Sequence, residues 1–133
     1  MYNDNINISS IETHLESVLR KHVCSRCYAG TLPSTLTDGA MDMVVIDCGN
    51  TIRDYHAYGY GSVNIYLYAQ PINGQKNVPA LSKLEKAFGK ALREDKFDNE
   101  DYSVARETLL SGTGYDTTYN MHYIIKAIRI TIL

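Results

Sequence analysis

The chain has 133 residues, of which thirteen are lysine or arginine and fifteen are aspartate or glutamate, so its formal net charge is −2. This balance argues against a protein that coats nucleic acid, because neutralising phosphates takes an excess of cations. Apolar residues make up 44% of the chain and charged residues 21%, which predicts a single domain over residues 1–133 and excludes a largely disordered chain. No apolar stretch approaches the roughly 20 residues that span a bilayer, so we expect no membrane partner.

Residues 9–23 are expected to form an amphipathic helix. Its apolar stripe consists of Ile11, Leu15, Val18 and Leu19. Ser9 is a suitable N-cap, and Glu12 three residues later completes a capping-box pattern. The periodicity stops at residues 24–40, where glycine, proline, serine and threonine indicate a loop or a poorly ordered arm. The segment is long for a connection within a compact domain, so we expect it to be either functional or mobile.

Strands are predicted in the middle of the chain. Residues 43–46 are continuously apolar, as in a buried strand, and residues 51–55 form a short second strand after a turn. Residues 62–70 alternate strictly, with aliphatic side chains at odd positions and polar or tyrosine side chains at even positions. This period places the aliphatic side chains toward the core and the tyrosines on the other face. Asn73 and Gly74 then indicate a turn.

A second helix is predicted at residues 77–94. Asn77 caps it, and Pro79 lies in its first turn, where the missing N–H does no harm. Residues 102–110 are predicted to form a strand. The glycine- and threonine-rich residues 111–118 indicate a turn.

The last predicted element is a long strand at residues 119–133. Its apolar residues fall at odd positions up to residue 125 and at even positions from residue 128. Either a bulge shifts the register, or part of the strand is buried on both faces. The order helix–strands–helix–strands predicts an α+β fold in which an antiparallel sheet carries both helices on one face.

The residue types that support catalysis or metal binding do not form a known motif. Cys24 and Cys27 have the spacing of half a zinc site, but no second pair of ligands follows, so we expect reduced thiols. The four histidines form no metal or catalytic pattern. Gly112 and Gly114 lack the third glycine of a phosphate-binding loop and are expected to be turn residues with positive φ. We therefore assign no catalytic, cofactor-binding or metal-binding residue.

Tyrosine is the unusual feature of the composition, with eleven residues against two phenylalanines and no tryptophan. Tyr66 and Tyr68 share a strand face, and Tyr55, Tyr58 and Tyr60 come just before them. Three interpretations stay open. In the first, helices cover this face and the tyrosines are semi-buried core. In the second, the face is a protein interface. In the third, nucleic-acid bases stack on it. The strand carries no cation, which makes nucleic acid the weakest of the three.

The chain resembles the tail-terminator and tail-completion proteins of long-tailed bacteriophages, in the form carried by prophages. The resemblance is clearest at residues 58–71, which read YGYGSVNIYLYAQP. It extends over residues 42–76, the helix from Asn77 and the closing strand at residues 123–133. The order of elements matches over almost the whole chain.

The resemblance implies a non-enzymatic virion protein without cofactors. Family members form a ring, often of six subunits, that terminates or completes the tail tube and connects it to the head. Its partners would be other copies of itself and other tail or neck proteins, first in the bacterial cytoplasm during assembly and then in the virion.

A ring needs two different patches on each subunit. The tyrosine argument assigns the following residues to a subunit interface: Tyr58, Tyr60, Tyr66, Tyr68 and Arg129. An exposed terminal strand would supply another contact by edge pairing. The alternative function is a small nucleic-acid-binding α+β domain that uses the tyrosine-bearing face.

Overall fold

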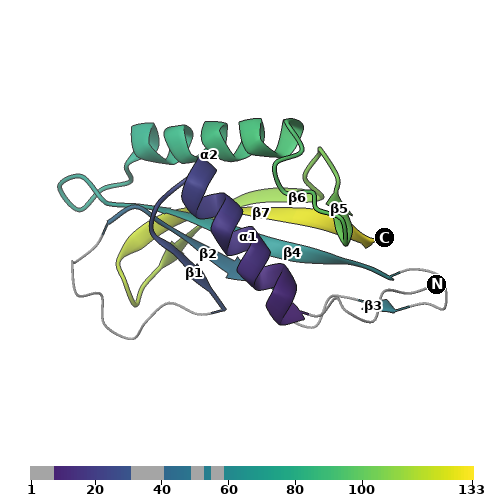
Figure 1. Ribbon diagram of the computed structural model, residues 1–133. Coiled ribbons are helices and arrows are strands. Elements are labelled where there is room, and N and C mark those ends of the chain that lie inside the picture. Colours follow the sequence, from purple (N-terminus) through teal and green to yellow (C-terminus); the bar gives the residue numbers. More distant parts are fainter. Residues whose placement is uncertain (1–7, 31–40, 49–52, 55–58) are drawn as a thin grey trace.

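The computed structural model describes residues 8–30, 41–48, 53–54 and 59–133 (Figure 1). The helices in this part of the chain are α1 (Ile8–His22) and α2 (Val78–Arg93). The strands are β1 (Cys27–Ala29), β2 (Met43–Asp47), β3 (Arg53–Asp54), β4 (Gly59–Ala69), β5 (Tyr102–Val104), β6 (Leu110–Asp116) and β7 (Met121–Ile132).

All of these strands belong to one sheet. Its order is β1-β2-β4-β7, with β5 and β6 following one another along the far edge of β7 and β3 beside β4. Every pair is antiparallel except β1 with β2, which run parallel. Both helices lie on the same face of the sheet (Figure 1). This arrangement confirms the predicted α+β fold and its order of helix, strands, helix, strands.

The two central strands, β4 and β7, explain the change of parity in the last strand. Their residues pair without interruption over the eleven residues of β4, so no bulge separates them. Even-numbered residues such as Ile124 and Ile128 pack under the helices. Met121 and Tyr123 pack on the opposite face. Burial of β7 on both faces is therefore the correct one of the two explanations.

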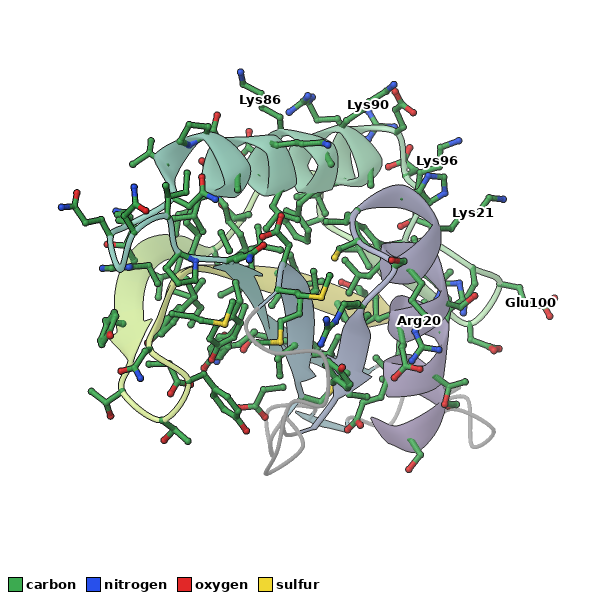
Figure 2. The ribbon with its side chains drawn as sticks, turned by 90° about the vertical axis from the view of Figure 1, so that its left-hand side faces the viewer. Arg20, Lys21, Lys86, Lys90, Lys96 and Glu100 are labelled. Atoms are coloured by element: carbon green, nitrogen blue, oxygen red, sulfur yellow. The ribbon has the colours of Figure 1, made fainter. Side chains whose placement is uncertain are left out.

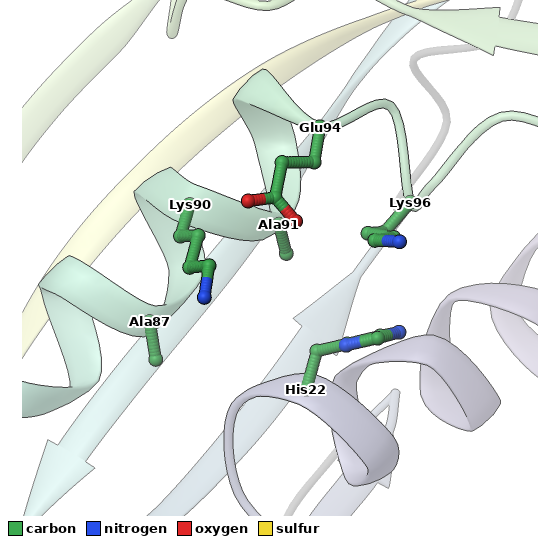
Figure 3. A pocket seen from close by; sticks show the side chains of 6 residues that line it. All are labelled: His22, Ala87, Lys90, Ala91, Glu94 and Lys96. Atoms are coloured by element: carbon green, nitrogen blue, oxygen red, sulfur yellow. The ribbon is translucent and has the colours of Figure 1, made fainter.

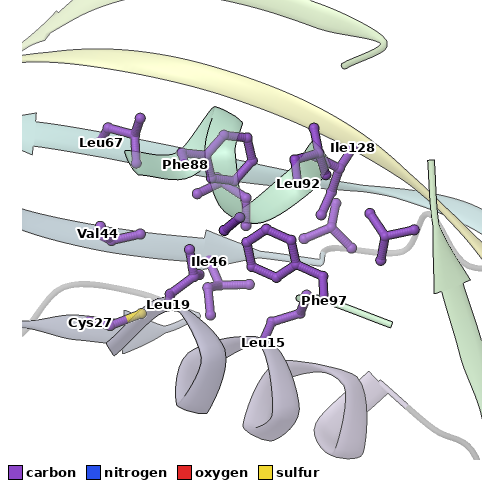
Figure 4. Close-up of a cluster of buried hydrophobic side chains, with 14 of the residues drawn as sticks. Leu15, Leu19, Cys27, Val44, Ile46, Leu67, Phe88, Leu92, Phe97 and Ile128 are labelled. Atoms are coloured by element: carbon purple, nitrogen blue, oxygen red, sulfur yellow. The ribbon is translucent and has the colours of Figure 1, made fainter. Parts of the chain in front are cut away.

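The larger core lies between the helices and the sheet (Figure 4). It contains Ile11, Leu15 and Leu19 from α1, and Leu81, Leu84, Phe88, Ala91 and Leu92 from α2. The aliphatic side chains of β4 face these stripes, as the alternation predicted. Phe97, just beyond α2, closes the layer with its ring centroid 5.6 Å from that of Phe88. Burying side chains of this size contributes about 1.5–3 kcal/mol each, so this layer is the main source of stability.

The connection from β4 to α2 follows the predicted turn and cap. Asn73 and Gly74 have φ of 52° and 74°, the left-handed values that an Asn-Gly turn requires. The Asn77 side chain accepts a hydrogen bond from the backbone N–H of Ala80 over 3.1 Å. It also donates to the carbonyl of Gln70 over 2.8 Å. One side chain therefore starts α2 and ties it to the end of β4.

The glycine-rich segment after β5 contradicts the predicted turn at residues 111–118, because β6 runs through most of it. Neither Gly112 nor Gly114 has positive φ. A Cβ atom added to Gly114 would lie 2.4 Å from the Tyr123 hydroxyl oxygen. Glycine is therefore needed here to admit a neighbouring ring, and the prediction was wrong because it considered only the backbone.

Other predicted boundaries also change. Helix α1 already includes Ile8, so Ser9 lies inside the helix and the capping-box prediction was wrong. The predicted loop at residues 24–40 contains β1, and residues 31–40 of it lie outside the described chain. Within the predicted strand 51–55, only Arg53 and Asp54 are described, as β3.

The predicted strand at residues 102–110 is interrupted. It ends as β5 at Val104 and resumes as β6 at Leu110, with the N–H groups of Ala105 and Leu109 still donating to β7 carbonyls.

Candidate interaction site on the tyrosine face of the sheet

The face of the sheet opposite the helices carries a second, smaller cluster, which we call the tyrosine face. Its buried members are Met43, Val45, Tyr68 and Met121, with Tyr28, Tyr66, Tyr119 and Tyr123 partly buried against them. The strand register explains this grouping, since Tyr68 pairs with Met43 on one side and Tyr123 on the other. Directly paired residues share a face, so the rings meet there.

Tyr123 joins the two tyrosines of β4. Its ring centroid lies 5.4 Å from that of Tyr66, edge to face, and 5.3 Å from that of Tyr68. Aromatic pairs in such geometry contribute about 0.5–1.5 kcal/mol beyond their buried area. Gly114 pairs with Tyr123 across the strands and leaves space for this ring. The three rings therefore hold each other in place.

Asp116, at the end of β6, ties the tip of the β6–β7 hairpin to this cluster. Its Oδ2 accepts a hydrogen bond from the Tyr68 hydroxyl over 3.1 Å. Its Oδ1 accepts from the backbone N–H groups of Thr118 and Tyr119, over 2.9 and 3.3 Å. Burial raises the pKa of Tyr68 above its ordinary value, and the hydrogen bond to Asp116 raises it further. The carboxylate is thus fixed beside a tyrosine that stays protonated.

A hollow of about 340 Å³ opens between this hairpin tip and the first strands of the sheet. Its lining residues are Gly30, Val45, Asp47, Tyr66, Tyr68, Asp116, Thr118 and Tyr119. Burial, and then the charge of Asp47, raise the pKa of Tyr66. Among the described residues of the lining, two are carboxylates and none is lysine, arginine or histidine. Carboxylates beside aromatic rings are complementary to a positively charged group.

The structure brings together two of the residues assigned to a subunit interface, Tyr66 and Tyr68, and places Arg129 on the same face farther along β7, opposite Ser62. Tyr66 is half-buried, Tyr68 is 6% exposed and Arg129 is exposed, and all three lie on the tyrosine face. Tyr58 lies outside the described residues, and of Tyr60 only the backbone is described. The expectation that helices cover these tyrosines was wrong, because both helices pack on the opposite face. The expectation that the tyrosines are partly buried core is confirmed for Tyr66 and Tyr68.

Several residues that complete this site carry no signal in the sequence. Asp47 lies at the end of β2, Asp116 lies in a segment predicted to be a turn, and Tyr119 was predicted to begin the last strand but precedes β7. Tyr123 was recognised only as one apolar position of the last strand. Tyr123 and Met121 are both odd-numbered residues of the same strand and therefore share a face. This alternation could have indicated that the tyrosine face continues across β7.

The expected edge contact of the terminal strand was wrong. β7 lies between β4 on one side and β5 with β6 on the other. A strand with apolar residues on both faces belongs inside a sheet, where both faces and both edges are covered. Within the described residues, β6 is an outer strand instead, and its Leu110 and Tyr115 are exposed.

Several lysine and arginine side chains, with Glu94 and Glu100 among them, lie on the side of the molecule that carries the helices. We call this region, formed by Arg20, Lys21, Lys86, Lys90 and Lys96, the basic patch (Figure 2). Arg20 is paired with Glu16 over 2.9 Å on α1. A hollow of about 470 Å³ lies between the ends of α1 and α2, and its polar lining consists of His22, Lys90, Glu94 and Lys96 (Figure 3).

The thiols and the half-buried His14 take part in packing. Cys27 and Cys48 are buried in the main core, and burial raises the pKa of both thiols to about 12. At neutral pH they are protonated and therefore poor nucleophiles. The hydroxyl of buried Tyr102 is hydrogen-bonded to Nδ1 of His14, and burial lowers the pKa of that histidine. No group of three metal-ligating side chains occurs in the described part of the chain.

Comparisons with protein-family models and with curated protein sequences found no match to this chain. Neither described helix is long and apolar enough to cross a lipid bilayer.

Proposed function

We propose that this chain is a non-enzymatic structural protein of a bacteriophage or prophage. It assembles as a ring that terminates or completes the tail tube and connects it to the head. The observation that carries the proposal is the tyrosine face, a partly apolar, hollowed surface on the side of the sheet that the helices leave uncovered within the described residues. Tyrosine suits such a surface because it offers large contact area at low entropic cost.

A ring also requires that each subunit present two unlike surfaces to its neighbours. The tyrosine face and the basic patch differ in chemistry and lie on opposite sides of the sheet. The resemblance of the sequence to tail-terminator proteins, clearest at residues 58–71, also supports the proposal. In this proposal the partners are other copies of the chain and tail or neck proteins, and no cofactor takes part. The protein acts in the bacterial cytoplasm during assembly and remains in the virion.

The alternative, a nucleic-acid-binding domain that uses the same face, is less well supported. Asp47 and Asp116 both line the hollow beside the tyrosines. Their carboxylates repel phosphate groups at the place where stacked bases would bring them. The charges of this face favour a protein partner.

The test is to locate the protein in tailed particles. Particles are induced from the cells that encode the chain, purified and labelled with a gold-conjugated antibody against it. The proposal expects label at the junction of head and tail, with several copies per particle by quantitative mass spectrometry. Tailed particles that lack the protein would overturn it.

A further inference from the structure

The tyrosine-face hollow has the chemistry of a site for a cationic side chain. The Asp116 carboxylate is held in place by hydrogen bonds from the Tyr68 hydroxyl and from the N–H groups of Thr118 and Tyr119. Asp47 is exposed at the end of β2, also in the lining. The rings of Tyr66 and Tyr68 line the same space, and their faces attract cations. The hollow therefore presents negative charge and aromatic surface together.

The same chain carries a matching cationic surface. Lys86 and Lys90 are four residues apart on α2 and therefore lie on the same side of that helix. Lys86 points outward from the molecule (Figure 2), and Lys90 lies at the rim of the hollow between α1 and α2, which Glu94 also lines (Figure 3). Both are exposed, so they can reach a partner.

These two surfaces cannot meet within one molecule. The helices and the tyrosine face lie on opposite sides of the sheet. Contact between them therefore requires a second copy of the chain. Because the two surfaces differ, an open assembly of any number of copies still has one free hollow at one end and one free lysine surface at the other. This is a heterologous contact, which closes into a ring when the rotation per subunit allows it.

We infer that the tyrosine-face hollow of one copy receives Lys86 and Lys90 of the next copy. The lysines approach the Asp47 and Asp116 carboxylates and the rings of Tyr66 and Tyr68. This contact rests on the proposed ring and specifies which two surfaces form its subunit interface.

Charge exchange tests the contact directly. The mass of the purified chain is measured by light scattering behind a sizing column, over a wide range of protein concentrations and at low salt. Wild type forms a species of several subunits. Asp47→Lys alone, or Lys86→Glu with Lys90→Glu, weakens association at least about tenfold, because like charges then face each other. Asp47→Lys combined with Lys86→Glu alone restores association, since a new lysine–glutamate pair replaces the original one and Lys90 is still available to Asp116.

Two controls separate a specific contact from a general effect of charge. Lys76→Glu changes an exposed lysine of the β4–α2 connection and leaves association unchanged. Melting temperatures within a few degrees of wild type show that the variants fold. Raising the salt from about 0.1 M to about 1 M shortens the screening length from about 10 to about 3 Å and weakens the wild-type oligomer.

The failures of this inference and of the proposed function are distinguishable. A wild-type chain that is monomeric at every concentration overturns the inferred contact, and the particle labelling still decides the proposed function. An oligomer that is indifferent to the charge reversals, or a combined variant as weak as its parents, also overturns the contact. In those cases the ring uses other surfaces.

Discussion

The fit of Tyr123 against Gly114 gives the sharpest test of how the tyrosine face is built. A Cβ atom at position 114 would lie 2.4 Å from both Cζ and Oη of Tyr123. Gly114→Ala must therefore move the ring by about 1 Å to reach an ordinary contact of 3.4 Å. That ring also packs against Tyr66 and Tyr68, so the displacement disturbs the whole cluster.

The neighbouring glycine provides a matched control. A Cβ atom at Gly112 would meet only the Cγ2 of Ile125, at 3.3 Å, so a shift of a few tenths of an ångström is enough. Replacing glycine by alanine without a clash stabilises a protein by about 0.4–1 kcal/mol, because the unfolded chain loses freedom. Overpacking costs about 1–3 kcal/mol. We expect Gly114→Ala to destabilise by about 1–2 kcal/mol and Gly112→Ala to be neutral or slightly stabilising.

Urea denaturation followed by circular dichroism measures both free energies of unfolding. In a Tyr123→Ala background the clash is gone, so Gly114→Ala should then behave like Gly112→Ala. The difference between the two backgrounds gives the coupling between the positions. Equal effects of the two glycine substitutions in wild type, or no coupling to Tyr123, would refute the reasoning.

Three further predictions concern hydrogen bonding, helix propensity and pH. Tyr68→Phe removes the hydrogen bond to Asp116 and should lower the free energy of unfolding, measured with urea, by about 1–2 kcal/mol. The loss stays this small because the carboxylate keeps its backbone donors. An unchanged midpoint would contradict this prediction. Gly89→Ala should raise the free energy of unfolding by about 0.5–1 kcal/mol, because the added Cβ meets only the movable end of Arg93 at 3.0 Å, and destabilisation would contradict it. Several buried groups have pKa values raised in the folded chain, which keeps them protonated. They are Cys27, Cys48, Tyr68 and Tyr102. Their contribution to the free energy of unfolding is complete at neutral pH. It should be lost above about pH 9, because the unfolded chain releases these protons at a lower pH than the folded chain does. A melting temperature that stays constant up to about pH 11 would contradict this prediction.

The sequence by itself determined the elements whose signals are local. The stripe of α1, the Asn77 cap and the alternation of β4 each depend on side chains within a few residues of one another. Periodicity also placed Tyr66 and Tyr68 on the face opposite the aliphatic residues, as observed. Helical and strand periods follow from backbone geometry, so such patterns survive in any tertiary context.

Only the tertiary structure decided how the tyrosine face is completed. The Tyr68 hydroxyl meets an Asp116 carboxylate 48 residues away in the sequence, and no local pattern indicates that contact. The Gly-Thr segment became strand β6 because it pairs with β7, and Gly114 leaves the space that the Tyr123 ring occupies. The terminal strand became central because apolar residues on both of its faces require cover on both. In each case the deciding interaction joins segments far apart in the chain, and its free energy depends on packing that exists only once the sheet has formed.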